Sequence, residues 1–179
     1  HVSVFFGLII LTGTLAFITW GTWWSVFWFL AYGNIYSFSN PLWHETGHKT
    51  AFQSKSLNEF FYYISSYLSN FEPVRWRYTH FVHHGNTYST ENPYDHEIEY
   101  GNNLKETPKN LIMNLIPFIE LFYFKKSIAY EIIQHALGIK TKVMQDCIPE
   151  NAQSKVIFNS RIFVAIWIAI ILWSLITLS

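Results

Sequence analysis

Long apolar stretches alternate along the chain with polar stretches that carry its charge. Val2–Trp20 is almost wholly apolar. As an α-helix it would be about 28 Å long, close to the ~30 Å hydrocarbon core of a bilayer. Gly21 and Thr22 interrupt this stretch, and the shorter apolar stretch Trp23–Tyr36 follows. Because no Asp, Glu, Lys or Arg precedes Pro41, the pattern favours a helical hairpin in a membrane over the buried hairpin of a soluble protein.

A third apolar stretch, Arg161–Leu178, has the ~18 residues that a membrane-spanning helix needs. We therefore expect an all-α integral membrane protein, with a single partial domain over residues 1–179. Residues 2–36 would form the membrane hairpin and residues 37–155 cytosolic or interfacial helices. Residues 160–179 would form a further membrane helix that begins a second hairpin.

Polar residues followed by proline indicate where helices begin in the middle of the chain. Asn40-Pro41 and Glu72-Pro73 both have this form, although Glu is a weaker cap than Asn. We expect the two histidine-bearing segments to lie on these two helices. The other expected segments are a polar loop over 85–103, a helix from Thr107-Pro108 that Pro117 kinks, and a polar linker over Lys140–Ser154.

Charge and composition indicate how the chain is oriented in the membrane, and they argue against nucleic-acid binding and cysteine-based sites. Twelve basic and twelve acidic residues give zero formal net charge, so no basic excess indicates a nucleic-acid partner. All of the basic residues lie between the expected hairpin and the start of the last expected membrane span at Arg161, which places this region in the cytoplasm by the positive-inside rule. The single cysteine, Cys147, excludes an internal disulfide and a cysteine-based metal site.

Two short segments hold five of the eight histidines. His44 and His48 are four residues apart, so on a helix their side chains share one face. His80, His83 and His84 are spaced i, i+3 and i+4 and also share a face. Imidazole is a common ligand of transition metals, so each segment is a candidate multidentate metal site.

The first segment, His-Glu-Thr-Gly-His, also fits the HExxH pattern of zinc hydrolases, in which Glu45 would be the general base. Five histidines exceed the three protein ligands of a catalytic zinc site. Carboxylate-rich di-iron bundles use two Glu-x-x-His pairs, and Glu45 with His48 is the only such pair in the chain. A nitrogen-rich site for one or two iron ions fits the residues better.

These two segments together, HETGH and WRYTHFVHHGNT, resemble the first two histidine boxes of the membrane fatty acid desaturase superfamily. The resemblance implies that five residues ligate iron in a non-haem di-iron centre that activates dioxygen: His44, His48, His80, His83 and His84. In that family a third histidine box follows a second membrane hairpin. We therefore expect the chain to be part of a longer protein, with that box beyond Ser179, and to be inactive as it stands.

Several further residues are candidates for supporting roles around the metal. Those that would contact ligands or bound water are Glu45, Asn86, Asp95, His96 and Glu97. We interpret His96 as a loop histidine in preference to a ligand, and the acidic residues as either support for ligand N–H groups or a solvated loop. Arg75 and Arg77 would meet a lipid headgroup, an acyl carrier or an electron donor.

The most direct functional hypothesis is an oxygen-dependent desaturase of lipid acyl chains. No flavin or nicotinamide fingerprint is present, so electrons would come from a separate ferredoxin or small haem protein. The same centre would also suit hydroxylation of alkanes, lipids or carotenoids. A zinc hydrolase that uses Glu45, and a non-catalytic protein that merely keeps the boxes, are the remaining alternatives.

Overall fold

The computed structural model describes residues 2–85, 96–97 and 124–178, and every regular element among them is a helix. The all-α prediction is therefore confirmed for this part of the chain. Contacts divide the chain into two compact units, His1–Ser69 and Asn70–Ser179. The loop expected after Gly85 and the helix expected from Thr107 lie almost wholly outside the described residues.

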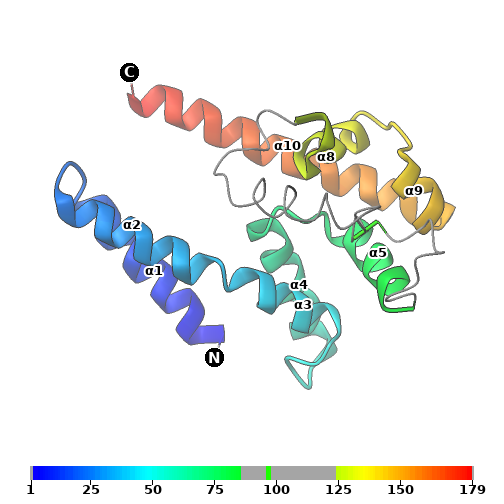
Figure 1. The fold of residues 1–179 in the computed structure, drawn as a ribbon, viewed down its shortest axis with the longest axis horizontal. Coiled ribbons are helices and arrows are strands. Elements are labelled where there is room, and N and C mark those ends of the chain that lie inside the picture. The colour runs from blue at the N-terminus through cyan, green and yellow to red at the C-terminus, as the bar shows by residue number, and fades with distance from the viewer. Residues whose placement is uncertain (1, 86–95, 98–123, 179) are drawn as a thin grey trace, which may run out of the picture. The chain divides into compact units, whose positions relative to one another are not determined.

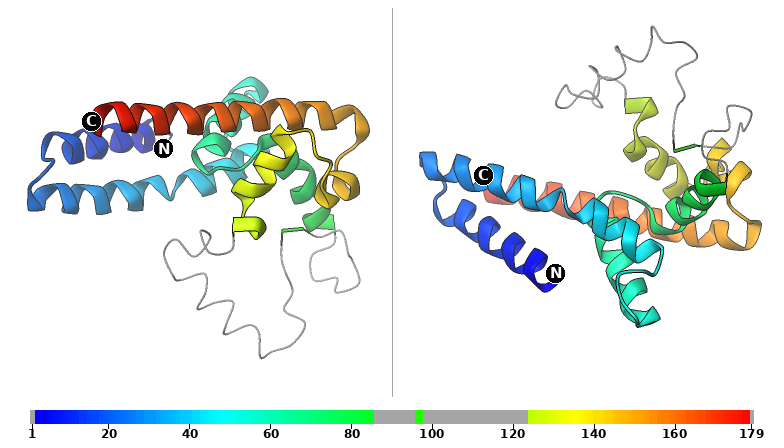
Figure 2. Two further views of the ribbon diagram at one scale, coloured as in Figure 1. Left: turned by 90° about the horizontal axis from the view of Figure 1, so that it is seen from above. Right: turned by 60° about the horizontal axis from the view of Figure 1, so that its bottom comes forward.

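The first unit begins with two helices, α1 (Val2–Ile18) and α2 (Trp23–Tyr36), which lie side by side (Figure 2). Gly21, at a φ of 81°, gives the chain the left-handed turn between them. The helices approach closely at Gly13, where a Cβ atom would lie 3.3 Å from the Tyr32 ring. Both helices expose many large apolar side chains, as a lipid-facing hairpin would. The insertion of this pair into a membrane stays a prediction.

Two shorter helices, α3 (Ser39–Gly47) and α4 (Lys55–Leu68), complete the first unit. Helix α3 begins just before the predicted Asn40-Pro41 signal. Tyr62 of α4 is 1% exposed and stacks on Trp43, with their ring centroids 6.3 Å apart. A Cβ atom at Gly47 would lie 3.0 Å from the Tyr62 ring, so glycine allows the two helices to pack this closely. Tyr62 therefore fixes the helix that carries His44.

The turn that follows α3 is held by one buried side chain, Asn58, which is 1% exposed. Its Nδ2 donates to the carbonyls of Phe52 at 2.6 Å and Ser54 at 3.0 Å, and its Oδ1 accepts from the Phe52 N–H at 3.1 Å. Lys49, directly after His48, has a φ of 62°, a conformation that few residues other than glycine adopt. Asn58 thus satisfies the backbone groups of the loop that reverses the chain after His48.

We expect Asn58→Ala to lower the free energy of unfolding by about 1–3 kcal/mol, because it leaves buried backbone groups of this loop without a partner. The measurement is denaturant or thermal unfolding of the detergent-solubilised protein. Asn151→Ala, at an exposed position in the first turn of α10, is the matched control. Equal stability of the two variants would contradict the role given to Asn58.

The second unit contains the helices α5 (Pro73–Gly85), α8 (Ile128–Ala136), α9 (Lys142–Cys147) and α10 (Glu150–Leu178), which are labelled in Figure 1. A short 3-10 turn, η1 (Phe124–Lys126), precedes α8. Helix α5 begins where Glu72-Pro73 predicts it. Helix α8 ends at Ala136, and Gly138, at a φ of 81°, allows the chain to turn away just after the C-cap residue Leu137.

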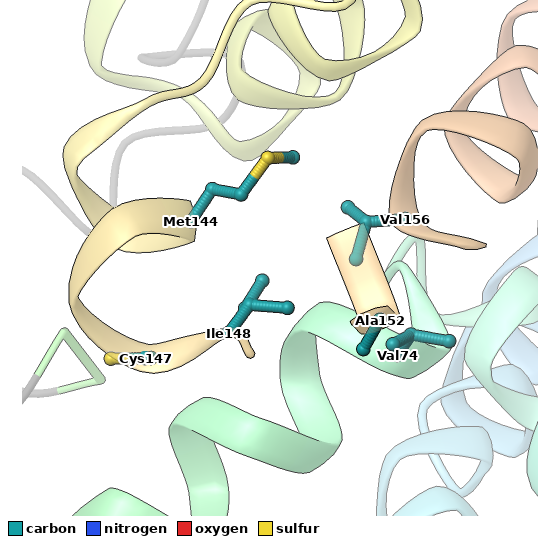
Figure 3. Close-up of a cluster of buried hydrophobic side chains, with 6 residues drawn as sticks. All are labelled: Val74, Met144, Cys147, Ile148, Ala152 and Val156. Carbon is teal, nitrogen blue, oxygen red and sulfur yellow. The ribbon is translucent and has the colours of Figure 1, made fainter. Parts of the chain in front are cut away.

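The prediction of a polar linker over Lys140–Ser154 is wrong, because this segment forms α9 and the first turn of α10. Three apolar residues occur among polar ones here, and all three are buried: Met144 and Cys147 on one side of α9, and the C-cap residue Ile148. They form the core of the unit with Val74 of α5 and with Ala152 and Val156 of α10 (Figure 3). The segment has too few apolar residues for its sequence pattern to predict a helix.

Helix α10 has 29 residues and extends well beyond the predicted span Arg161–Leu178. Within the described residues it is the one helix long and apolar enough to cross a membrane, and an 18-residue window of it has a mean hydropathy of 2.1. Its first half packs against α5 and α8, and Val156 and Phe163 are fully buried. Its second half exposes large apolar side chains, among them Ile171 and Trp173.

Candidate metal centre

The first histidine pair, His44 and His48, lies at the end of α3. The ring centroids are 4.6 Å apart, with an angle of 68° between the ring planes. The helix ends at Gly47, so His48 is the C-cap residue, and its N–H donates to the His44 carbonyl at 3.1 Å. This bond keeps the one-turn spacing, and the two rings therefore lie next to each other as the sequence predicts.

Glu45, between these histidines, has local partners. Its Oε2 accepts from the Thr50 hydroxyl at 2.8 Å, and its Oε1 lies 3.5 Å from Nδ1 of His44. The Thr50 hydroxyl, followed by the His44 ring, lowers the pKa of Glu45 below its ordinary value. The carboxylate is thus engaged beside a histidine ring on an exposed surface, an arrangement that suits support of His44 better than activation of a water molecule.

The second set lies on α5. Nε2 of His80 and Nε2 of His84 are 3.0 Å apart, and the two rings are perpendicular at 89°. Two imidazole nitrogens bound at right angles to one metal ion, each at ~2.0–2.1 Å, are about 3 Å apart. His83 has its ring centroid 6.1 Å from that of His80, with the two planes nearly parallel at 26°. His80 and His84 therefore have the spacing of neighbouring ligands of one ion.

Glu97 and His96 are the candidates for supporting roles that the structure describes beside α5. Oε2 of Glu97 lies 2.9 Å from Nδ1 of His80, and Oε1 accepts from the Thr79 hydroxyl at 3.2 Å. Nε2 of His96 lies 3.0 Å from Oδ2 of Asp146 on α9. Of the other candidates, Asn86 and Asp95 lie outside the described residues.

The start of α5 is held by Glu72, which is 1% exposed. Its carboxylate caps the helix by accepting from the backbone N–H groups of Val74 and Arg75, and it also accepts from Nδ2 of Asn159 on α10 at 2.8 Å. Burial raises the pKa of Glu72 to about 7, although these three hydrogen bonds oppose the shift. The sequence predicts the cap, but not the contact with Asn159, which lies 87 residues away.

The interpretation of Arg75 as a contact for a headgroup or an electron donor is wrong. Its guanidinium is 6% exposed and forms a bidentate ion pair with Glu131 of α8, with both nitrogen–oxygen distances 3.1 Å. Nη1 also donates to the Thr79 hydroxyl at 3.4 Å. Next to this pair, His135 is buried and its Nε2 lies 2.8 Å from the Thr141 hydroxyl. Arg75 therefore joins α5 to α8 and does not face a partner molecule.

We expect the pH dependence of stability to change in Glu72→Gln. The folded-state pKa of Glu72 is raised to about 7 from 4.5, so the folded protein retains a proton that the unfolded chain loses. The stability that protonated Glu72 contributes is complete below pH 4.5 and falls as the pH rises to about 7.

The measurement is thermal unfolding of the detergent-solubilised protein between pH 5 and about pH 8. The wild-type protein should lose more stability over this range than Glu72→Gln, whereas Glu150→Gln at an exposed site should follow the wild type. Parallel curves for the wild type and Glu72→Gln would contradict the shift.

A sequence model of the family described as Fatty acid desaturase matches residues 6–178, nearly the whole chain. The chain belongs to the fatty acid desaturase family. No curated protein and no solved structure matches the chain. Members of this family are membrane-bound oxidoreductases of lipids and generally hold two iron ions.

The donor atoms of this desaturase-family chain suit iron. Within each unit, neighbouring imidazoles lie on one helix, and imidazole is a ligand that iron accepts readily. In α5, a carboxylate contacts the ring nitrogen of His80 that faces away from His84, as is usual for metal-bound histidine. The predicted ligands therefore fit the metal that the family uses.

Proposed function

We propose that this protein is an oxygen-dependent desaturase of lipid acyl chains, with a di-iron centre bound in the cytosol-facing region. Its iron ligands are His44, His48, His80, His83 and His84. The observation that carries the proposal is the geometry of His80 and His84, whose Nε2 atoms lie at the separation of two ligands of one ion. The family match supports the class of reaction.

Iron, when bound, would supply the activation of dioxygen and the removal of hydrogen from unactivated C–H bonds. The chain would hold the ligands in place. His80 and His84 would present Nε2 to the metal, while Glu97, which accepts from the Thr79 hydroxyl, holds the outer edge of the His80 ring. Tyr62 of α4 packs against Trp43 of the helix that carries His44, and Arg75 with Glu131 holds α5 against α8.

The same centre would also support hydroxylation, since the outcome depends on which hydrogen of the substrate lies next to the oxidant. A hydrolase with zinc at His44 and His48 has weaker support. In such an enzyme Glu45 must activate water, whereas here its carboxylate accepts from Thr50 and lies beside Nδ1 of His44. Electrons would come from a separate ferredoxin or small haem protein, and the substrate would be an acyl lipid in the membrane.

We expect protein expressed from the complete open reading frame to bind about two iron ions, as the family generally does. His80→Ala and His84→Ala should each lower the bound iron to half or less, because a lost ligand opens the site. Glu45→Gln should retain most of the iron and the activity. The measurements are elemental analysis of the purified protein and mass spectrometry of lipids from cells that express it.

Three results separate the alternatives. Zinc at one ion per chain, with activity abolished in Glu45→Gln, would establish the hydrolase and refute the proposal. A hydroxylated lipid without an alkene would identify a hydroxylase that uses the same centre. Iron content unchanged in both His80→Ala and His84→Ala would remove these histidines from the ligand set.

A further inference from the structure

Two adjacent residues, His96 and Glu97, contact two different helices of the second unit. Glu97 contacts Thr79 at 3.2 Å and His80 at 2.9 Å, both on α5. His96 contacts Asp146 of α9 at 3.0 Å. The short segment therefore links the histidine-bearing face of α5 to α9, which packs against α5 through the buried core.

The contact between Glu97 and His80 decides which ring nitrogen is available to a metal. A carboxylate oxygen accepts hydrogen bonds and does not donate them, so Nδ1 of His80 carries the hydrogen. In the neutral ring, Nε2 of His80 then carries a lone pair, and it faces Nε2 of His84 at 3.0 Å. Without Glu97, Nδ1 would lose this acceptor, and the preference for the hydrogen on Nδ1 would weaken.

The contact between His96 and Asp146 gives Glu97 its position. The side chains of Glu97, His96 and Asp146 are 10%, 17% and 16% exposed, so water competes little for these contacts. Asp146 lies on α9 between two buried residues of the core, Met144 and Cys147. Helix α9 is thus a fixed support, and His96 connects Glu97 to it.

We propose that His96 and Glu97 form a positioning clip for the second histidine segment, and that neither residue is a metal ligand. Glu97 orients His80 through Nδ1 so that Nε2 faces the metal, and the contact of His96 with Asp146 holds Glu97 in place. This inference rests on the proposed function in so far as it concerns iron, but the orientation of the His80 ring can be observed without any metal.

The first test measures the iron dissociation constant of the protein from its complete open reading frame, by competition with a chromogenic chelator. Glu97→Ala should weaken binding by about 10–100-fold, which is the usual effect of removing a carboxylate behind a ligating histidine. Glu97→Gln should largely restore affinity, because its amide oxygen still accepts from Nδ1–H. Glu150→Gln, an exposed acidic residue of the same unit, is the control and should not change the affinity.

A double-mutant cycle tests the role of Asp146. Asp146→Ala should weaken iron binding in the wild-type protein and should have little further effect in Glu97→Ala, because it acts through Glu97. Additive effects of the two substitutions would show that Asp146 acts independently and would overturn the clip. Complete loss of one iron ion in Glu97→Gln would make Glu97 a ligand and would also overturn it.

The second test needs no metal. In metal-free protein labelled with ¹⁵N-histidine, long-range ¹H–¹⁵N spectra distinguish the hydrogen on Nδ1 from that on Nε2, and His80→Ala identifies the His80 signals. The wild type should carry the hydrogen on Nδ1, and Glu97→Ala should shift it toward Nε2. An unchanged spectrum in Glu97→Ala would overturn the clip. A wild-type protein that shows the Nδ1 signal but binds no iron would instead refute the proposed function.

Discussion

The buried polar contacts at the start of α5 hold the second unit together. Arg75 and Glu131 join α5 to α8, and Glu72 and Asn159 join α5 to α10. Loss of one partner of a buried ion pair costs about 3–5 kcal/mol, because the other charge is left without compensation. These contacts therefore fix the direction in which α5 leaves the core, and His80, His83 and His84 lie one to three turns further along the same helix.

The sequence predicts local geometry well where one helix determines it. The four-residue spacing of His80 and His84 predicts neighbouring rings, and the structure places their Nε2 atoms 3.0 Å apart. The signal at Glu72-Pro73 likewise predicts the start of α5 to the residue. In both cases the backbone of one helix relates the residues, so no information from the rest of the fold is needed.

Contacts between distant elements could not be predicted in this way. Nothing in the sequence distinguishes Glu131 and Asn159 from other polar residues. Glu131 lies 56 residues from its partner Arg75, and Asn159 lies 87 residues from its partner Glu72, so no helical period relates either pair. The role of Asp146 could not be predicted either, because it lies on a helix of six residues with too few apolar positions for the sequence to indicate a helix. Sequence position thus identified the histidines and made Glu97 a candidate for supporting them. The roles of Glu131, Asn159 and Asp146 became apparent only from the tertiary structure.

Helix α10 is continuous from Glu150 to Leu178. A helix of that length extends about 43 Å, whereas the hydrocarbon core of a bilayer is ~30 Å thick. If the exposed apolar half spans the membrane, the remaining turns project from it as the same rigid rod, and Asn159 of that rod contacts the cap of α5. Any tilt with which α10 adapts to a thicker or thinner bilayer would then move α5 as well, so that the lipid composition of the membrane would influence the position of His80 and His84.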